Sequence, residues 1–169
     1  MMSTLARCLD CGLRGKAVLG EGPQPAHVML IGQNPGAEEE KQGRPFVGRA
    51  GKYLNKVLET NNIKREELFI TSVVKCRTPG NRKPTGQEIA SCLPLLMEQI
   101  KRVRPKIIVL MGEVAWQTPR LEGIKYLITY HPAAAMRFLK IRQKFEADFK
   151  KLKEMSEELL LIKGDSWSH

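Results

Sequence analysis

Residues suited to ligand chemistry gather between positions 27 and 51. A buried strand is predicted to stop at Gly32, and a Gln-Asn-Pro-Gly turn follows at positions 33–36. Such residues form sharp bends that expose backbone N–H groups to a ligand. Within the turn, Asn34 can donate and accept hydrogen bonds, so its uncharged amide can orient a water molecule. Farther along, Phe46 lies in a Gly- and Pro-rich loop, where its ring can stack on a planar base for about 1–3 kcal/mol.

His131 is the second candidate for chemistry. It follows a predicted strand at positions 124–129 and precedes Pro132, which fixes the backbone beyond it. A lone histidine is most often structural. At the carboxyl end of a strand, opposite the turn that holds Asn34, it is placed to donate a hydrogen bond to a ligand. Asn34, Phe46 and His131 together predict a pocket for an aromatic base.

Strands and helices alternate along the chain, which predicts an α/β fold with a parallel sheet between two helical layers. Apolar runs predict strands at 26–31, 68–74, 106–111 and 124–129. Apolar periodicity and caps predict helices from about 49, at 85–104, at 113–117, and from 134 or 138 to 160. Ligands bind such sheets outside the carboxyl ends of the strands. The loops with the candidate residues all fall on that edge, at 32–48, 72–84 and 130–137.

The charge of the chain indicates a polyanionic partner. Its formal net charge is +10 and its pI is about 9.6. Nucleic acid is the first expectation and a membrane surface the second, while a solvated basic surface without a partner is the alternative. No apolar run approaches the roughly 20 residues of a membrane span, and the N-terminus lacks the apolar core of a signal peptide. We therefore expect one soluble, cytoplasmic domain over residues 1–169 that does not bind membranes.

The four cysteines predict a metal site. They form a C-x2-C pair, a long gap and a C-x15-C pair, at Cys8, Cys11, Cys76 and Cys92. Disulfides are rare in cytosolic proteins, and four thiolates can close one site for zinc or for an iron–sulfur cluster. The spacing does not choose between these two. The alternative, four unrelated buried thiols, leaves unexplained why no cysteine falls outside this arrangement.

Several motifs resemble the uracil-DNA glycosylase superfamily, and most closely family 4, the bacterial and archaeal iron–sulfur enzymes. These are GQNPG at 32–36, GRPFVG at 43–48, KCR at 75–77 and HPA at 131–133, together with the four cysteines. The resemblance extends from Cys8 to the last helix. It implies a uracil-DNA-glycosylase-like, three-layer α/β/α fold with a four-stranded parallel sheet. It also implies that the cysteines bind a structural [4Fe–4S] cluster, which would pin the N-terminal segment to the loop at 77–84.

The resemblance also implies a mechanism and a set of roles. The enzyme flips a base out of DNA and hydrolyses its N-glycosidic bond, leaving an abasic site. His131 would hydrogen-bond the O2 atom of the departing base, a contact that can lower the barrier by about 3 kcal/mol. The base-binding residues would be Gln33, Gly36, Glu39, Phe46 and Ser72. The DNA-binding residues would be Arg77, Arg82, Lys83, Arg137 and Met136, the last as a wedge in the minor groove.

Two positions depart from family 4. Its members commonly have Glu-Ala or Glu-Gly where this chain has Gln33-Asn34. An Asn at this place resembles the mismatch-specific and single-strand-selective families, which implies that Asn34 positions the attacking water. Ser72 replaces an Asn whose amide reads the uracil edge. Because a hydroxyl is shorter and can donate or accept, we expect a specificity that extends to hypoxanthine, xanthine or mismatched bases.

The leading hypothesis is a monofunctional, monomeric DNA glycosylase that acts on DNA containing deaminated bases. None of the motifs positions a lysine for Schiff-base chemistry. The first alternative is a non-catalytic binder of damaged or single-stranded DNA on the same fold, which the two departures keep open. The second is an iron–sulfur redox protein or a small-nucleotide-binding protein, for which the positive charge would be incidental.

Overall fold

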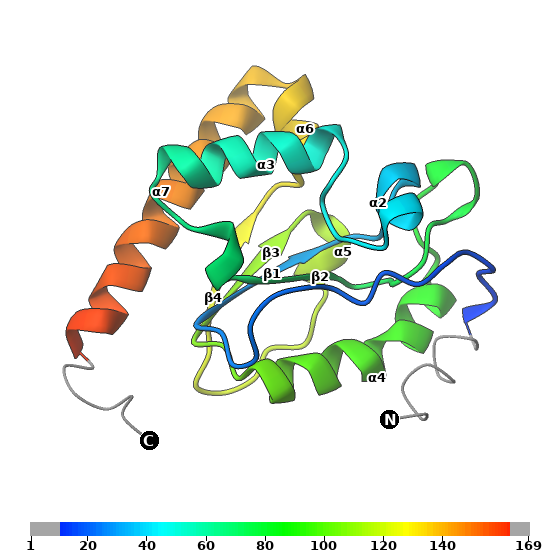
Figure 1. The fold of residues 1–169 in the computed structure, drawn as a ribbon, viewed down its shortest axis with the longest axis horizontal. Coiled ribbons are helices and arrows are strands. Elements are labelled where there is room, and N and C mark those ends of the chain that lie inside the picture. The colour runs from blue at the N-terminus through cyan, green and yellow to red at the C-terminus, as the bar shows by residue number, and fades with distance from the viewer. Residues whose placement is uncertain (1–10, 163–169) are drawn as a thin grey trace.

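The computed structural model describes residues 11–162, and Cys8 lies outside them. A four-stranded sheet runs through the middle of this part of the chain (Figure 1). The strands lie in the order β2-β1-β3-β4, and every neighbouring pair is parallel. Their bounds are β1 (Val28–Gly32), β2 (Phe69–Ser72), β3 (Ile107–Met111) and β4 (Lys125–Thr129). The predicted four-stranded parallel sheet is confirmed.

The sequence of each strand matches its place in the sheet. The two central strands, β1 and β3, are apolar throughout and buried at every position. Strands with helices over both faces need such continuous apolar sequences. The edge strand β4 instead exposes Lys125 and Ile128 and buries Leu127 and Thr129. The central strands therefore form the core that places the loops at their carboxyl ends.

Helices cover both faces of the sheet (Figure 1). On one face, α3 (Arg49–Thr60) and α7 (Leu139–Ile162) pack on a cluster that includes Leu30, Leu54 and Phe145. On the other, α4 (Gly86–Val103) and α5 (Glu113–Trp116) pack on a cluster with Ile31 and Leu96. No helix in the described part of the chain combines the length and apolar content that crossing a bilayer requires. The predicted three-layer α/β/α fold is confirmed.

The start of α4 is a capping box formed by Thr85 and Glu88. The Glu88 backbone N–H donates to Thr85 Oγ1 at 3.2 Å, and the Thr85 backbone N–H donates to Glu88 Oε2 at 2.9 Å. These two bonds satisfy helix-end N–H groups that have no partner within the helix. The helix then carries Cys92 inward, where its side chain is buried.

Two loops that sequence left irregular contain short helices. The acidic run forms α2 (Ala37–Gln42), with Glu38, Glu39 and Glu40 in its first turn, where the helix dipole favours negative charge. The structure has two helices where one last helix was predicted. The first, α6 (Pro132–Arg137), is separated from α7 by Phe138. Two 3₁₀ turns, η2 (Arg65–Glu67) and η3 (Pro79–Asn81), complete the loops.

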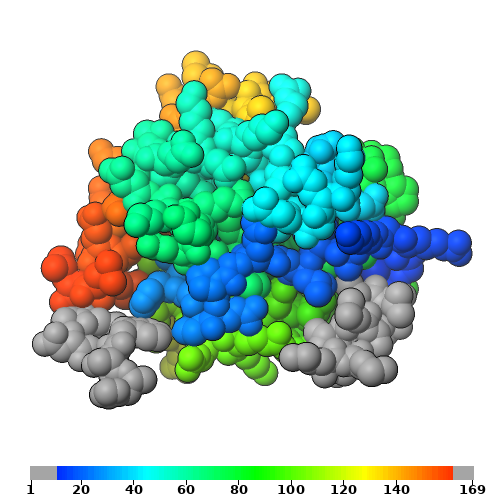
Figure 2. Space-filling view, in the orientation of Figure 1, coloured from blue at the N-terminus to red at the C-terminus, as the bar shows by residue number. Residues whose placement is uncertain are grey.

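The segment at 11–26 crosses one face of the molecule. Figure 2 shows it in blue, between the cyan of α2 and α3 and the green of α4. It is held by a backbone bond from Val18 N to Lys75 O and by two between Glu21 and Ile70. The fully buried Lys75 donates to Gln99 Oε1, and Gln99 donates to the Leu19 carbonyl. The segment therefore lies against β2 and beside the carboxyl edge of the sheet.

Candidate active site

Two adjoining cavities open at the carboxyl edge of the sheet. The small cavity has a volume of about 50 Å³ and the adjoining cavity about 470 Å³. Asn34, Pro35, Glu39 and His131 line both of them. The small cavity is further lined by Val18, Pro45, Phe46, Ala50, Gly51 and Ser72. The adjoining cavity is further lined by Gln33, Gly36, Asn81, Ala133, Ala134, Arg137 and Phe138. The end of β2 and the loops that follow β1 and β4 thus meet around the two cavities.

Phe46 lies on the backbone of β1. A Cβ atom on Gly32 would lie 2.4 Å from Phe46 Cζ, so the ring rests where only glycine leaves room. The backbone of Phe46 is left-handed, with φ of 47°. For a residue other than glycine this conformation costs about 1–3 kcal/mol and needs support from its surroundings. Gly51 gives part of that support, because a Cβ there would lie 2.0 Å from the Phe46 carbonyl oxygen.

His131 is a neutral hydrogen-bond donor in this site. Its Nδ1 accepts from the backbone N–H of Ala133 at 3.1 Å, which caps α6. The single proton of the neutral ring is therefore on Nε2. Burial lowers the pKa of His131 to about 4, so the ring is neutral at physiological pH. The His131 ring lies 5.8 Å from that of Phe46, centroid to centroid, at 34°.

The amide of Asn34 has a defined orientation. Its Nδ2 donates to the Pro35 carbonyl at 3.2 Å and to Thr78 Oγ1 at 3.5 Å. Its Oδ1 accepts from Gln33 Nε2 at 3.2 Å. An amide oxygen has two lone pairs, so one remains for a water molecule or a ligand. Asn34 therefore presents an acceptor, and its donors are occupied.

Ser72 is nearly buried at the end of β2, and its hydroxyl is also oriented. Its Oγ lies 2.7 Å from the Val74 carbonyl oxygen. A carbonyl oxygen only accepts, so the hydroxyl proton points to Val74 and the lone pairs of Oγ remain for the cavity. The sequence allowed Ser72 to donate or to accept. The structure makes it an acceptor.

Glu39, Gln33 and Gly36 lie beside the cavities, but Glu39 is engaged with the backbone. Its Oε2 accepts from the N–H groups of Gly48 at 2.7 Å and Val47 at 3.2 Å. Its Oε1 accepts from the N–H of Gly36 at 3.2 Å. The carboxylate thus joins the GQNPG turn to the loop that carries Phe46. Gln33 and Gly36 line only the adjoining cavity.

The three basic residues predicted to face phosphate lie together between β2 and α4. Arg82 makes a bidentate ion pair with Glu88, at 2.7 and 3.0 Å, which lowers the pKa of Glu88 to about 2. Lys83 pairs with Glu113 at 3.3 Å, and Arg77 Nε donates to Asn81 at 2.9 Å. Arg82 and Lys83 are exposed at the surface.

The structure separates Met136 from the site. Met136 lines another cavity, between α3 and α7, with Tyr53 and Arg142. Arg137 and Phe138 line the adjoining cavity instead, and 53% of Phe138 is exposed. Phe138 was missed from sequence because it was counted as the start of a helix. Its signal was an aromatic residue five positions after the end of the HPA motif.

The three described cysteines are buried in neighbouring clusters. Burial raises the pKa of the Cys11 thiol, and its neighbour Cys92 raises it further. Cys76 Sγ donates to the Gly15 carbonyl at 3.7 Å, and Leu13 packs against both clusters. Within residues 11–162, no three His, Cys, Asp or Glu side chains group as a metal site. Buried thiols are the soft donors of a zinc or iron–sulfur site.

Two further residues shape the site without a sequence signal. Thr78 Oγ1 accepts from Asn34 and donates to the Arg82 carbonyl. Arg65, in η2, donates to the carbonyl oxygens of Pro45 and Phe46. Their contacts join segments 44 and 19 residues apart, so no local pattern could reveal them.

Comparison with known proteins agrees with this geometry. Residues 19–154 match the model of the uracil DNA glycosylase superfamily. A type-4 uracil-DNA glycosylase of Saccharolobus solfataricus is 40% identical, over 88% of this chain and 81% of that protein. Type-4 enzymes of Archaeoglobus fulgidus (34%; 88% and 87%) and Thermotoga maritima (38%; 78% and 79%) are similar to the chain as well. The chain belongs to the uracil-DNA glycosylase superfamily.

Proposed function

We propose that the small cavity is where a base flipped out of DNA is held while its bond to the sugar is hydrolysed. Superfamily membership makes the chain a DNA glycosylase, an enzyme that hydrolyses N-glycosidic bonds and acts in uracil repair. The observation that carries our assignment is that Asn34, Phe46 and His131 line one cavity. A base in it contacts an aromatic face, a hydrogen-bond donor and a water-binding acceptor. An extrahelical base needs such a pocket.

His131 and Asn34 divide the chemical work in this proposal. The departing base gains negative charge, and the Nε2–H of His131 stabilises it as a neutral, preorganised donor. The attacking water donates a hydrogen bond to Asn34 Oδ1, which turns a lone pair of the water toward the sugar. No Asn34 donor competes, because both are bonded to Pro35 and Thr78. The abasic sugar and the free base are the products.

Ser72 favours bases that carry a ring N–H. Its hydroxyl donates a hydrogen bond to the Val74 carbonyl, so Oγ is left to accept a hydrogen bond from the base. Deamination turns the ring-nitrogen acceptor of cytosine or adenine into an N–H donor, in uracil or hypoxanthine. An N–H there bonds to Ser72, whereas an unprotonated nitrogen leaves two acceptors face to face. We propose deaminated bases in DNA as substrates on this ground.

The rim of the adjoining cavity contacts the DNA around the flipped nucleotide. We assign Phe138 as the wedge that fills the vacated space, in place of Met136, because Phe138 is exposed and lines this cavity. Arg137 lines the same cavity and is exposed, so it can reach phosphate. We propose that Arg77, Arg82 and Lys83 also contact the DNA backbone.

We propose that Cys11, Cys76, Cys92 and Cys8 hold a structural [4Fe–4S] cluster. The buried thiols and the resemblance to type-4 enzymes support this. When bound, the cluster supplies structural cross-linking. Visible absorption and an iron content near four atoms per chain would support it, whereas zinc alone would refute it. We further propose a cytoplasmic monomer with one domain, because thiolate ligands persist in a reducing compartment.

Excision from defined duplexes tests the function. Duplexes with one uracil, hypoxanthine, xanthine or thymine are incubated with the protein and treated with alkali, which cleaves abasic sites. We expect cleavage at uracil first and none at cytosine or adenine. Asn34→Ala should slow single-turnover excision more than it weakens DNA binding, because its role is in the transition state. Tight, salt-dependent binding without release of any base would instead establish the non-catalytic binder.

A further inference from the structure

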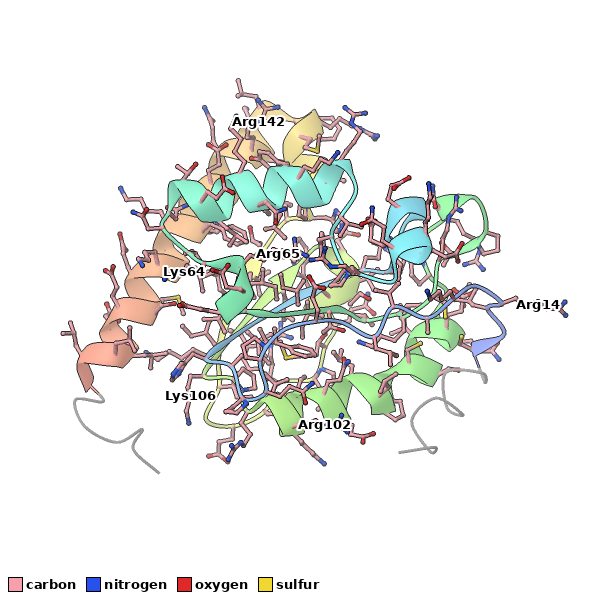
Figure 3. The ribbon with its side chains drawn as sticks, viewed as in Figure 1. Arg14, Lys64, Arg65, Arg102, Lys106 and Arg142 are labelled. Carbon is pink, nitrogen blue, oxygen red and sulfur yellow. The ribbon has the colours of Figure 1, made fainter. Side chains whose placement is uncertain are left out.

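Arg65 stands out because it is charged, largely shielded and far in sequence from the motifs. Only 19% of its side chain is exposed. It follows α3, and Figure 3 shows it beneath that helix, between α3 and the sheet. The chemistry assigned above does not use it, and it lines neither of the two cavities at the carboxyl edge.

The guanidinium of Arg65 donates hydrogen bonds to two successive backbone carbonyls, those of Pro45 and Phe46. Nη2 donates to the Pro45 carbonyl at 2.6 Å and Nη1 to the Phe46 carbonyl at 3.0 Å. The planar fork of arginine places two donors in a fixed geometry, so two successive carbonyls are held at once. Lysine has no such fork. These bonds lie at Phe46, the one residue of the loop other than a glycine whose φ is left-handed.

The guanidinium is itself anchored from two other segments. Nη1 donates to Asn55 Oδ1 in α3 at 2.6 Å, and Nη2 lies 3.3 Å from Glu21 Oε1. Glu21 also makes a bidentate pair with Arg44, at 2.8 and 2.9 Å, and its pKa is lowered, first by that hydrogen bond and also by Arg65. Arg65 therefore fixes the loop against a helix and against the N-terminal segment.

We infer that Arg65 is a positioning residue for base excision, acting through Phe46. The bonds to the Pro45 and Phe46 carbonyls hold the left-handed turn, and the turn places the ring over Gly32 in the cavity wall. Without these two hydrogen bonds the backbone at Phe46 is free to change conformation. The ring then no longer lies parallel to a base held in the cavity. Displacement of a binding group by about 1 Å can cost about 100-fold in rate. The inference rests on the proposed role of Phe46 as the stacking surface.

A double-mutant cycle on the full-length protein tests this. The variants are Arg65→Met, Phe46→Ala and the two combined, with single-turnover excision of uracil and DNA binding as readouts. We expect Arg65→Met to slow excision by roughly 10- to 100-fold with little change in binding. In the Phe46→Ala background the same change should cost about twofold or less, because contacting groups couple. Arg65→Lys should behave like Arg65→Met, since it lacks the fork.

Arg44→Met is the matched control. It removes a guanidinium that also pairs with Glu21 but contacts neither carbonyl, so its excision rate should stay within about twofold of wild type. Should Arg65→Met not fold, Asn55→Leu loosens the anchor and should show a smaller loss that Phe46→Ala again abolishes. Equal losses with and without Phe46, or an equal loss in Arg44→Met, would overturn the role of Arg65. No effect of Phe46→Ala alone would instead overturn the stacking role.

Discussion

The two loops that border the site are built in opposite ways. The Phe46 loop, residues 43–48, is held by backbone hydrogen bonds to buried or half-buried charges: Glu39 accepts from two of its N–H groups and Arg65 donates to two of its carbonyls. The α6–α7 corner, residues 137–139, leaves 53% of Phe138 and 66% of Leu139 exposed. The Arg142 side chain donates to two carbonyls of α6, those of Ala135 and Met136, and not to the corner itself.

The difference shows how one edge of the sheet can both hold a stacking ring in a fixed position and offer exposed apolar groups to DNA. A ring that must stack on a base with a positional accuracy of a fraction of an ångström needs its backbone fixed before the substrate arrives. Apolar groups that enter DNA need exposure, and they gain partners only on binding. Substitutions in the Phe46 loop should therefore affect the rate of excision, and substitutions at the α6–α7 corner should affect DNA binding.

The largest effect is expected at His131. His131→Leu removes the Nε2–H donor that stabilises the departing base, so single-turnover excision should fall by about 100- to 1,000-fold, as for other preorganised donors. Affinity for the substrate duplex should change little. The exposed His27, which lines neither cavity, is the control, and His27→Gln should keep its rate. A loss of binding as large as the loss of rate would contradict a role for His131 in the transition state.

Ser72→Ala should have a moderate effect. It removes one acceptor from the cavity wall, and a net hydrogen bond of about 0.5–1.5 kcal/mol corresponds to roughly 2- to 10-fold in uracil excision. The preference for uracil over cytosine should narrow, because the clash between acceptors disappears with the hydroxyl. The measurement is kcat/KM on matched duplexes. Unchanged discrimination would show that another group reads the base edge.

Phe138→Ala should act mainly on binding. Loss of an intercalating ring should weaken affinity for a duplex with an abasic analogue by a few-fold to about 10-fold, while the single-turnover rate at saturating enzyme changes less. Leu139→Ala is the matched control, since Leu139 is more exposed but does not line the adjoining cavity. Met136→Ala should resemble the control. A larger effect for Met136 than for Phe138 would reverse our reassignment of the wedge.

The smallest effect concerns pH and stability. Burial lowers the pKa of His131 to about 4, against about 6.5 in an unfolded chain. Between these values the unfolded chain binds a proton that the folded protein does not, so this group lowers the free energy of unfolding as pH falls from about 6.5 to 4. Urea unfolding of wild type and His131→Leu should therefore show a stability difference that shifts against wild type at about pH 5 relative to about pH 7.

Much of the fold was predictable because its signals are local. Continuous apolar runs mark the central strands, Thr85 and Glu88 mark the start of α4, and Gly48 precedes α3. The short helix α2 was missed because an acidic run also suits a loop, and α6 was expected as part of the last helix or of the loop at 130–137, not as a separate helix. Phe46 and His131 were placed at one edge by the rule for parallel sheets, and the cavity brings them together.

Residue types and their order along the chain determined the parallel sheet, the edge that carries the site and the family likeness, because apolar periodicity and short motifs act over few residues. Tertiary structure alone decided what each polar group does. The Ser72 hydroxyl donates to the Val74 carbonyl, and the ring proton of neutral His131 lies on Nε2. Arg65 donates to the carbonyl of Phe46, 19 residues away in sequence. Hydrogen-bond direction depends on which atoms meet in space, and only the packed chain brings those atoms together.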